Sequence, residues 1–435
     1  MSKIHLACFL AYGPNGHGTV TWKHPRTGVG FSWDRPDIFI EMAKVCERGK
    51  FDMMLFADAL GVHETYGGSM DSYLRHSVQV PIFDPMPLIA QLAGHTQHIG
   101  LTATMSTTYY PPFLLARLCA TIDHLSRGRM GWNVVTSFSP IEAQNFGLEE
   151  MLSHEERYER AEEYLELCRQ LWDSWEADAV IMDKEHAIFA DPSKVHQIHF
   201  SGKYFKSRGP LTVPRSPQGR PAIVQAGASE KGRDYAAKHA DAVFAIKNSI
   251  EDMKSYYDDV KERMVKYGRD PEECKIFFGV QPVIGETEEA AWRKQQQLLD
   301  LSDEEAGLAW ISGETAVDLS PYPLDEPLPP MEVKGLQGKI LQYYGSGKKP
   351  TLREIARHDA VGTTWPMVGT AEQVATQIEE VVRQVGGDGF AIIPTYWPSS
   401  LTEFVEMVVP ILQEKRLFRK EYAGQTLKDH LRQGD

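Results

Sequence analysis

The chain lacks the features that mark several large classes of protein. Its five cysteines are scattered, with no close pairs and no zinc-type spacing, which fits reduced thiols in a core better than disulfides or metal ligands. Asp and Glu outnumber Lys and Arg by 60 to 46, and no basic run occurs, which argues against a nucleic-acid partner. The first apolar stretch, residues 4–12, is too short to span a membrane and has no signal-peptide layout. We therefore expect a cytoplasmic protein without a nucleic-acid or membrane partner.

Common catalytic motifs are missing as well. The His63-Glu64 and His154-Glu155 pairs both lack the second histidine, four residues after the first, of a metallohydrolase helix. No Gly-x-Gly-x-x-Gly sequence follows a predicted strand, which argues against a Rossmann-type nicotinamide site. Residues 342–349 resemble a phosphate loop, but Gln342 and Lys349 replace the Gly and the Ser or Thr that it requires. We expect no protein-bound metal.

Short apolar runs alternate with amphipathic helical patterns along the whole chain, which is typical of βαβ units and a parallel sheet. The predicted strands are residues 5–11, 51–57, 99–105, 129–136, 222–227, 242–246, 275–283 and 389–395. The predicted helices are residues 35–50, 111–126, 155–175, 230–239, 250–267, 287–299, 371–385 and 401–415. This alternation favours closure into a (β/α)8 TIM barrel, formed as a single domain by residues 1–435.

Three segments do not fit a minimal barrel: residues 58–85, 178–220 and 300–365. The third is the most irregular, with six prolines and several glycines, and its C-terminal part carries Tyr343, Tyr344 and Trp365. Long irregular insertions in a compact fold are usually functional covers or loose links. We expect residues 300–365 to form a lid over the mouth of the barrel.

Polar side chains stand where the predicted strands end. The second strand runs into Asp58, the third contains Thr104, and the fourth contains Asn133 and is followed by Ser137. The fifth is followed by residues 225–229, which lead directly into a helix, so that backbone N–H groups there form a natural phosphate site. Because barrel active sites lie at the C-terminal ends of the strands, we expect the site to be there.

Several longer segments show a specific resemblance. They are FADAL at 56–60, YYPP at 109–112, GRMGWNVVTS at 128–137, NFG at 145–147, HEERYERAEEYLEL at 154–167, DPSKVH at 191–196 and GPLTVPRSPQGRPAIVQAGASEKGR at 209–233. In this order, and over nearly the whole chain, the sequence resembles the nitrilotriacetate monooxygenase group of the bacterial-luciferase-like flavin monooxygenases. Members of that group act on aminopolycarboxylates, dibenzothiophene sulfone, dimethyl sulfide and long-chain alkanes.

The resemblance implies the oxygenase component of a two-component monooxygenase with a luciferase-like TIM barrel. Such enzymes take reduced FMN from a separate NAD(P)H:FMN reductase and add O2 at flavin C4a to form a peroxide that oxygenates the substrate. A diffusible flavin agrees with the missing nicotinamide fingerprint, because the protein then supplies only binding and orientation. The resemblance also implies a homodimer or a homotetramer.

Flavin-contacting residues are carried over position by position. Asp58 and Thr104 resemble contacts to the flavin ring, and Asn133 and Ser137 lie in the flavin-side strand motif. His154, Tyr158 and Ser229 resemble contacts to the ribityl chain and the phosphate, with Ala228 beside them. Structural roles stay open: Asp58 could cap a turn, Thr104 could bond to backbone, Asn133 could satisfy a loop carbonyl, and His154 could simply follow the helix cap Ser153.

Two histidines are candidates for setting the protonation state of the peroxide. His17 follows the first strand, and His63 lies five residues beyond Asp58. Gln79 and Trp365 are further candidates for lining the pocket, and a purely structural role for each histidine is equally open.

The substrate class is less defined: a small organic sulfide or sulfone, an alkane or an amine. Pro14, Phe138 and Trp310 stand where the alkane branch has a thiol and two imidazoles, which argues against alkane hydroxylation. The pocket loops also lack the Arg and Lys cluster that an aminopolycarboxylate would require. The alternatives are a deazaflavin-dependent hydride transferase of the same superfamily and a flavin-binding protein without turnover.

Overall fold

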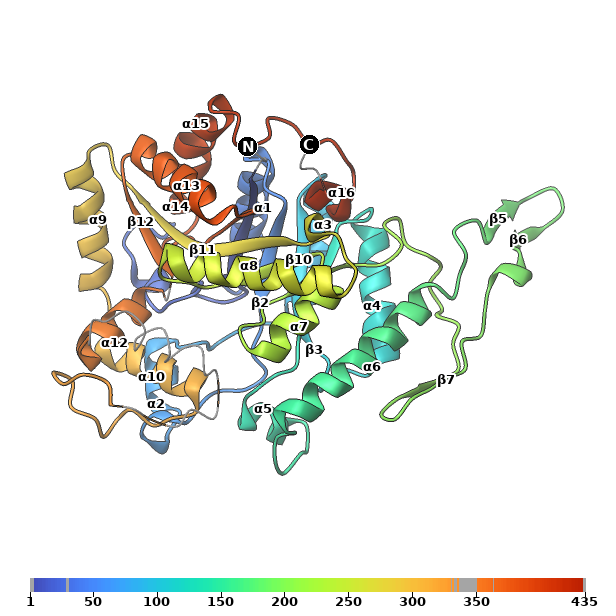
Figure 1. Cartoon of the computed structure of the whole chain (residues 1–435), viewed down its shortest axis with the longest axis horizontal. Helices are drawn as coiled ribbons and strands as arrows, with labels where there is room; N and C mark the ends of the chain where they lie inside the picture. Colours follow the sequence, from blue (N-terminus) through green and yellow to red (C-terminus); the bar gives the residue numbers. More distant parts are fainter. Residues whose placement is uncertain are drawn as a thin grey trace.

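The computed structural model describes residues 4–28, 31–329, 331, 335, 350–362 and 364–432. Eight parallel strands close into a barrel, with β13 returning to β1, and helices cover its outside (Figure 1). In barrel order the strands are β1 (His5–Ala11), β2 (Met53–Ala57), β3 (Gly100–Ser106), β4 (Met130–Val135), β9 (Ala222–Gln225), β10 (Ala242–Ala245), β11 (Lys275–Ile284) and β13 (Gly389–Ile392). The predicted TIM barrel and its eight strands are confirmed.

The covering helices occur where the amphipathic patterns predict them. They are α1 (Asp37–Arg48), α4 (Pro112–Leu125), α6 (His154–Trp172), α7 (Glu230–His239), α8 (Ile250–Lys266), α9 (Glu288–Asp300) and α13 (Ala371–Val385). The helix predicted at 401–415 is instead divided into α14 (Ser399–Glu403), a π-helical turn η5 (Phe404–Val408) and α15 (Val409–Glu414). Pro410 follows that turn, and because proline has no N–H to donate, the regular ladder cannot continue through it.

Side chains inside the barrel are separated from the larger core between the barrel and its helices. Phe9, Leu55, Val224, Phe244 and Phe277 are among those that fill the interior. Beneath them the C-terminal helix α16 (Leu427–Arg432) inserts two leucines and closes the N-terminal end of the barrel. Figure 1 shows both chain ends at this closed end and α2, α5 and α10 at the opposite end. The open end therefore faces the loops that follow the strands.

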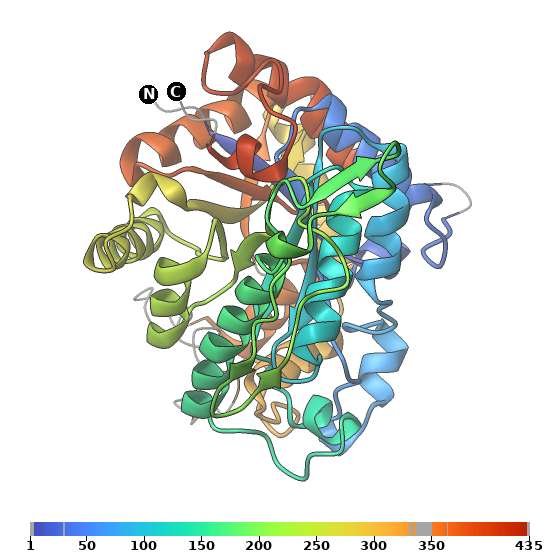
Figure 2. The ribbon, with the colours of Figure 1, turned by 90° about the vertical axis from the view of Figure 1, so that its right-hand side faces the viewer.

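The insertion at 58–85 contains η2 (Tyr66–Gly68) and α2 (Asp71–His76), and α3 (Pro85–His95) begins at its end. The insertion at 178–220 forms two small antiparallel sheets. They consist of β5 (Val180–Asp183) with β6 (Ile188–Ala190), and β7 (Phe200–Ser201) with β8 (Lys206–Ser207). Figure 1 shows β5 and β6 extending away from the barrel on the side of α6, and Figure 2 views that side face-on.

The segment 300–365 is more regular than its sequence suggests. It contains α10 (Glu304–Thr315) and α12 (Leu352–Val361), so the expectation of an irregular segment is wrong for these stretches. Residues 306–315 are all buried, and a helix that is buried on every side shows no amphipathic period. Trp365 begins β12 (Trp365–Gly369), an extra strand paired with β11 that the sequence did not predict. Tyr343, Tyr344 and the phosphate-loop-like residues 342–349 lie outside the described residues.

Within the described ranges, none of the helices is both long and apolar enough to cross a lipid bilayer.

Candidate active site

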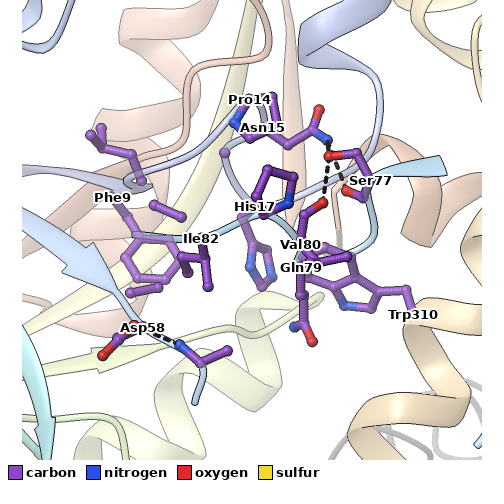
Figure 3. Close-up of a pocket in the computed structure, with 16 residues that line it drawn as sticks. Phe9, Pro14, Asn15, His17, Asp58, Ser77, Gln79, Val80, Ile82 and Trp310 are labelled. Carbon is purple, nitrogen blue, oxygen red and sulfur yellow. Dashed lines mark hydrogen bonds between the residues drawn. The ribbon is translucent and has the colours of Figure 1, made fainter. Parts of the chain in front are cut away.

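A cavity that is partly open to solvent lies at the C-terminal ends of β1 and β2 (Figure 3). Its walls come from the end of β1 and the loop after it, the end of β2, the loop before α3, and α10. The lining residues are Phe9, Leu10, Ala11, Pro14, Asn15, Gly16, His17, Ala57, Asp58, Ala59, Ser77, Gln79, Val80, Pro81, Ile82 and Trp310. The cavity thus lies at the end of the barrel where the sequence placed the site.

Four aromatic rings form a row from the barrel interior to α10. Phe244 stacks on Phe9 with ring centroids 4.4 Å apart, and Phe9 meets His17 at 5.5 Å. His17 in turn meets Trp310 edge-on at 5.1 Å, and Figure 3 shows the imidazole between Phe9 on one side and Trp310 with Gln79 on the other. We call Phe244, Phe9, His17 and Trp310 the aromatic row.

The loop that carries His17 is tied to the loop before α3. Asn15 donates its amide N–H groups to the carbonyl oxygen of Ser77 at 3.0 Å and to the Ser77 hydroxyl at 3.1 Å. The Ser77 hydroxyl donates to the carbonyl oxygen of Val80 at 2.8 Å. These bonds fix Gln79, which lies between Ser77 and Val80 with a positive φ of 53°, against the cavity.

Asp58 places a carboxyl group at the edge of the cavity. Burial, together with the nearby Asp84 carboxylate, raises the pKa of Asp58 to about 7, although the Ala59 N–H donates to it at 2.9 Å. A carboxyl with such a pKa changes its protonation state near neutral pH and can donate as well as accept a proton.

His63 does not line this cavity, although Gln79 and His17 do. It lies behind Gln79, with which it forms a hydrogen bond, and Gly313 of α10 packs on its ring. Burial lowers the pKa of His63, so its imidazole is neutral at physiological pH. Trp365 packs against the core around the barrel and does not line the cavity.

Two buried acceptors near the C-terminal end of the barrel have no partner among the described residues: one on Asn133 of β4 and one on Gln225 of β9, whose side chain points outward towards Tyr158 of α6. Asn133 donates to the Thr104 hydroxyl at 2.8 Å, and that hydroxyl donates to the carbonyl oxygen of Phe56 at 2.8 Å. The oxygen Oδ1 of Asn133 and the oxygen Oε1 of Gln225 have no hydrogen-bond partner among the described residues. Buried polar atoms are normally bonded, so these two oxygens indicate a ligand that brings N–H or O–H donors.

Ser137 follows β4 in a left-handed conformation, with φ 58°. Its hydroxyl lies 2.9 Å from the Ser106 hydroxyl, and its carbonyl oxygen accepts a bond from Arg157. The Arg157 guanidinium also reaches the Thr136 hydroxyl at 3.4 Å, which draws α6 to the end of β4.

The N-termini of α6 and α7 meet at one point. His154, the first residue of α6, places Nε2 3.3 Å from the hydroxyl of Ser229, the N-cap of α7. Tyr158, one turn further along α6, is partly buried, and desolvation of its hydroxyl raises its pKa although hydrogen bonds with Ser229 and Gln225 oppose the rise. Ala228 is exposed beside Ser229. As predicted, Ser153 rather than His154 caps α6, accepting from the Glu156 N–H at 3.2 Å.

This meeting point suits an anion. Helix N-termini offer unpaired N–H groups and partial positive charge, and Arg157 and Lys231 both act on His154 as nearby positive charges. A side chain at Gly227 would come within 2.4 Å of Gln225 Oε1 and 2.6 Å of the Gly232 carbonyl oxygen, so only glycine leaves this loop close to the helix. The structure therefore combines two converging helix N-termini, unpaired buried acceptors and a largely apolar cavity at the C-terminal end of the barrel.

Sequence reasoning did not find the contribution of α10. The sequence marks Trp310 only as a departure from the alkane branch, and nothing in it singles out Phe9, Asn15 or Ser77. All four share the cavity with Gln79 and His17. The only signal that could have found any of them is the position of Phe9 and Asn15 near the end of the first strand.

A barrel of this kind, with a cavity and converging polar side chains at the C-terminal ends of its strands, has the architecture of an enzyme active site. The luciferase-like monooxygenase family matches residues 15–389, and the chain belongs to this family. It is an oxidoreductase, as the sequence predicted.

Individual relatives are similar over almost their whole length. N-acetyl-S-(2-succino)cysteine monooxygenase from Bacillus subtilis (strain 168) is 43% identical, with 98% of this chain and 96% of the relative covered. Dibenzothiophene-sulfone monooxygenase from Rhodococcus erythropolis (strain XP) is 41% identical, with 99% and 96% covered. The crystal structure of long-chain alkane monooxygenase superposes with a TM-score of 0.90 at 38% identity, covering 99% of this chain and 96% of that one. The predicted resemblance is confirmed.

Proposed function

We propose that this chain is the oxygenase component of a two-component FMN-dependent monooxygenase that acts on a small organic substrate. The observation that carries the proposal is a pair of unpaired buried acceptors, Asn133 Oδ1 beside Thr104 and Gln225 Oε1 beside Tyr158, together with the meeting of two helix N-termini at Ser229. FMN carries hydroxyl and ring N–H donors, which unpaired acceptors can bind, and a phosphate, which helix N-termini can bind. The residues present therefore fit FMN. A crystal structure of a riboflavin lyase, 33% identical to this chain, contains a modified FMN.

Under this proposal the flavin-site residues divide into two groups. Asp58, Thr104, Asn133 and Ser137 would hold the ring and the inner ribityl hydroxyls. His154, Tyr158, Ala228 and Ser229 would hold the phosphate end. When bound there, reduced FMN would supply the two electrons that activate O2, one atom of which enters the substrate while the other leaves as water. His17 and Gln79 would face that substrate, and His63 would act through Gln79.

This chain's own residues would manage protons and water. Asp58, with a pKa near 7, can exchange a proton at the carboxyl oxygen that faces the cavity. The aromatic row and α10 exclude water from the same space, which protects a reactive oxygen donor from hydrolysis. We further propose that residues 300–365 serve as the cover, because Trp310 of α10 already forms one wall of the cavity. Limited proteolysis should then cut first within 300–365, more slowly with FMN and substrate; equal rates would contradict a cover.

A separate NAD(P)H:FMN reductase is the expected partner. Nitrilotriacetate monooxygenase component A, at 39% identity, is named as one part of a larger system, and the matching chain of pristinamycin IIA synthase, at 38% identity, is named as one of its subunits. The hydride-transferase alternative has less support, because an F420-dependent alcohol dehydrogenase is only 16% identical and shares the fold alone.

The decisive experiment supplies the purified protein with chemically reduced FMN and O2, and screens sulfides, sulfones, alkanes and tertiary amines for oxygenated products by mass spectrometry. Oxygen incorporation from labelled O2 supports the proposal. Product formation without O2 would indicate hydride transfer, and FMN binding with peroxide release but no product from any class would indicate a flavin-binding protein. NADH with oxidised FMN and no reductase should give no product.

A further inference from the structure

The indole of Trp310 carries a polar atom that nothing in the described structure satisfies. Its side chain is 3% exposed and lines the cavity, and its Nε1–H has no hydrogen-bond partner among the described residues. A buried N–H without an acceptor is unfavourable, so its presence in a cavity wall points to an acceptor on the molecule that fills the cavity. Figure 3 shows Trp310 on the same side of the cavity as Gln79.

The position of this indole is fixed by packing. Gly307 lets α10 approach α12 so closely that a Cβ there would lie 1.9 Å from the Ala356 carbonyl oxygen. At the start of α10, Glu305 accepts a bond from the Ser72 hydroxyl of α2 at 2.5 Å, and His76 lies 3.6 Å from the same carboxylate. A donor held by a helix with such contacts is preorganised for one direction of approach.

The rest of the cavity selects against charge. Besides the aromatic row, the walls carry Val80, Pro81 and Ile82, and none of the described lining residues is Lys or Arg. The only ionisable acid among them is Asp58, which would repel an anion once it loses its proton. A neutral molecule with a flat apolar body therefore fits these walls better than a di- or tricarboxylate.

We propose that Trp310 is a specificity-determining residue: its Nε1–H donates a hydrogen bond to a sulfonyl or carbonyl oxygen on a neutral, ring-containing substrate. The inference rests on the proposed function, because it takes this cavity as the substrate site. The substrate class is thereby narrowed to molecules that combine an apolar ring system with one oxygen acceptor, and plain hydrocarbons bind less tightly because they leave the indole N–H unpaired.

The test uses two rigid tricyclic probes of similar size, dibenzothiophene sulfone and fluorene, which differ in the sulfonyl oxygens. Their dissociation constants are measured by calorimetry with protein holding oxidised FMN, so that no turnover occurs. In the unsubstituted protein the sulfone should bind more tightly than fluorene. Trp310→Phe keeps an aromatic ring but removes the N–H donor. It should weaken binding of the sulfone about three- to tenfold while leaving the affinity for fluorene unchanged.

Two further variants complete the experiment. Trp310→His offers a ring N–H again and should recover part of the sulfone affinity. Trp292→Phe makes the same exchange at a tryptophan that is 55% exposed on α9, and should change neither affinity. If Trp310→Phe weakens binding of both probes equally, Trp310 only packs against the ligand and the proposal is wrong. An unchanged sulfone affinity in this variant, or no preference for the sulfone in the unsubstituted protein, would also overturn the proposal.

The outcomes also separate this inference from the proposed function. FMN affinity, followed by quenching of flavin fluorescence, should be the same in the unsubstituted protein and in Trp310→Phe. If FMN does not bind at all, the proposed function fails. If FMN binds but its affinity drops in Trp310→Phe, the indole contacts the flavin and the substrate role is wrong.

Discussion

Replacing Tyr158 by Phe gives a sharp test of the anion site. The Tyr158 side chain is partly buried and forms hydrogen bonds with Ser229 and Gln225, so its hydroxyl lies where α6 and α7 begin. A hydrogen bond to a charged group contributes about 1.5–3 kcal/mol, and about 1.4 kcal/mol corresponds to a tenfold change in affinity. Tyr158→Phe should therefore weaken FMN binding by about ten- to a hundredfold.

The comparison with riboflavin makes this prediction specific. Riboflavin has the same ring and ribityl chain but no phosphate, so its affinity should change little in Tyr158→Phe. Flavin fluorescence quenching measures both constants in one assay. Tyr235→Phe is the matched control, because the buried Tyr235 ring lies 6.0 Å from the Tyr158 ring but its hydroxyl donates to the Ala161 carbonyl oxygen, at 3.4 Å, and not to Ser229 or Gln225 in any hydrogen bond of the described residues. Unchanged FMN affinity, or equal losses for FMN and riboflavin, would refute the placement of the phosphate.

Three other predictions concern titration, stability and assembly. Because the pKa of Asp58 is raised to about 7, its protonated form stabilises the fold fully below about pH 4, and this contribution is lost as the pH rises through 7. In flavin-free protein the Tm advantage of Asp58→Asn over the unsubstituted chain should therefore grow between about pH 5 and pH 7 and then level off; an advantage independent of pH would contradict the shift. Arg129→Met should lower the free energy of unfolding in urea by about 3 kcal/mol or more, and Arg129→Lys by less, because the buried Arg129 guanidinium donates hydrogen bonds to residues 93, 96, 99 and 126. A loss below about 1 kcal/mol in Arg129→Met would show that water replaces these bonds. Light scattering should give the mass of the dimer or tetramer that the family resemblance implies, and a monomeric mass would contradict assembly. If the β5–β6 arm contributes to the interface, Phe189→Asp should lower the measured mass, because Phe189 is 64% exposed on that arm.

The barrel could be predicted from the sequence because its strands are buried on both faces. Strand β11 is buried along its whole length, and its residues 276–280 form a continuous apolar run, as expected of a strand covered on both faces. Helix starts are equally clear, since Thr370 with Gln373 forms the capping box that its spacing predicts. Each of these patterns can be recognised from neighbouring residues alone, and the tertiary packing in the structure favours the same local conformation.

The same reasoning failed for α10 because its signal is not local. Residues 306–315 are buried on every side, by α2, by α12 and by the loop that carries His63, so neither an amphipathic stripe nor a strand alternation appears. The position of Asp58 and Thr104 followed from the rule that barrel sites lie at strand ends. The meeting of His17 with Trp310 joins segments almost three hundred residues apart, and no sequence period encodes such a contact.

The division between barrel and insertions also explains how one fold accommodates different substrates. The proposed flavin contacts Thr104 and Asn133 stand on strands packed on both sides, where a change of size or polarity is costly. The cavity walls at Pro14, Val80 and Trp310 come instead from loops and an inserted helix, where substitution alters the ligand space without disturbing the strand ladder. Substrate range should therefore follow the wall residues, and exchanges confined to them should alter selectivity while leaving FMN affinity intact.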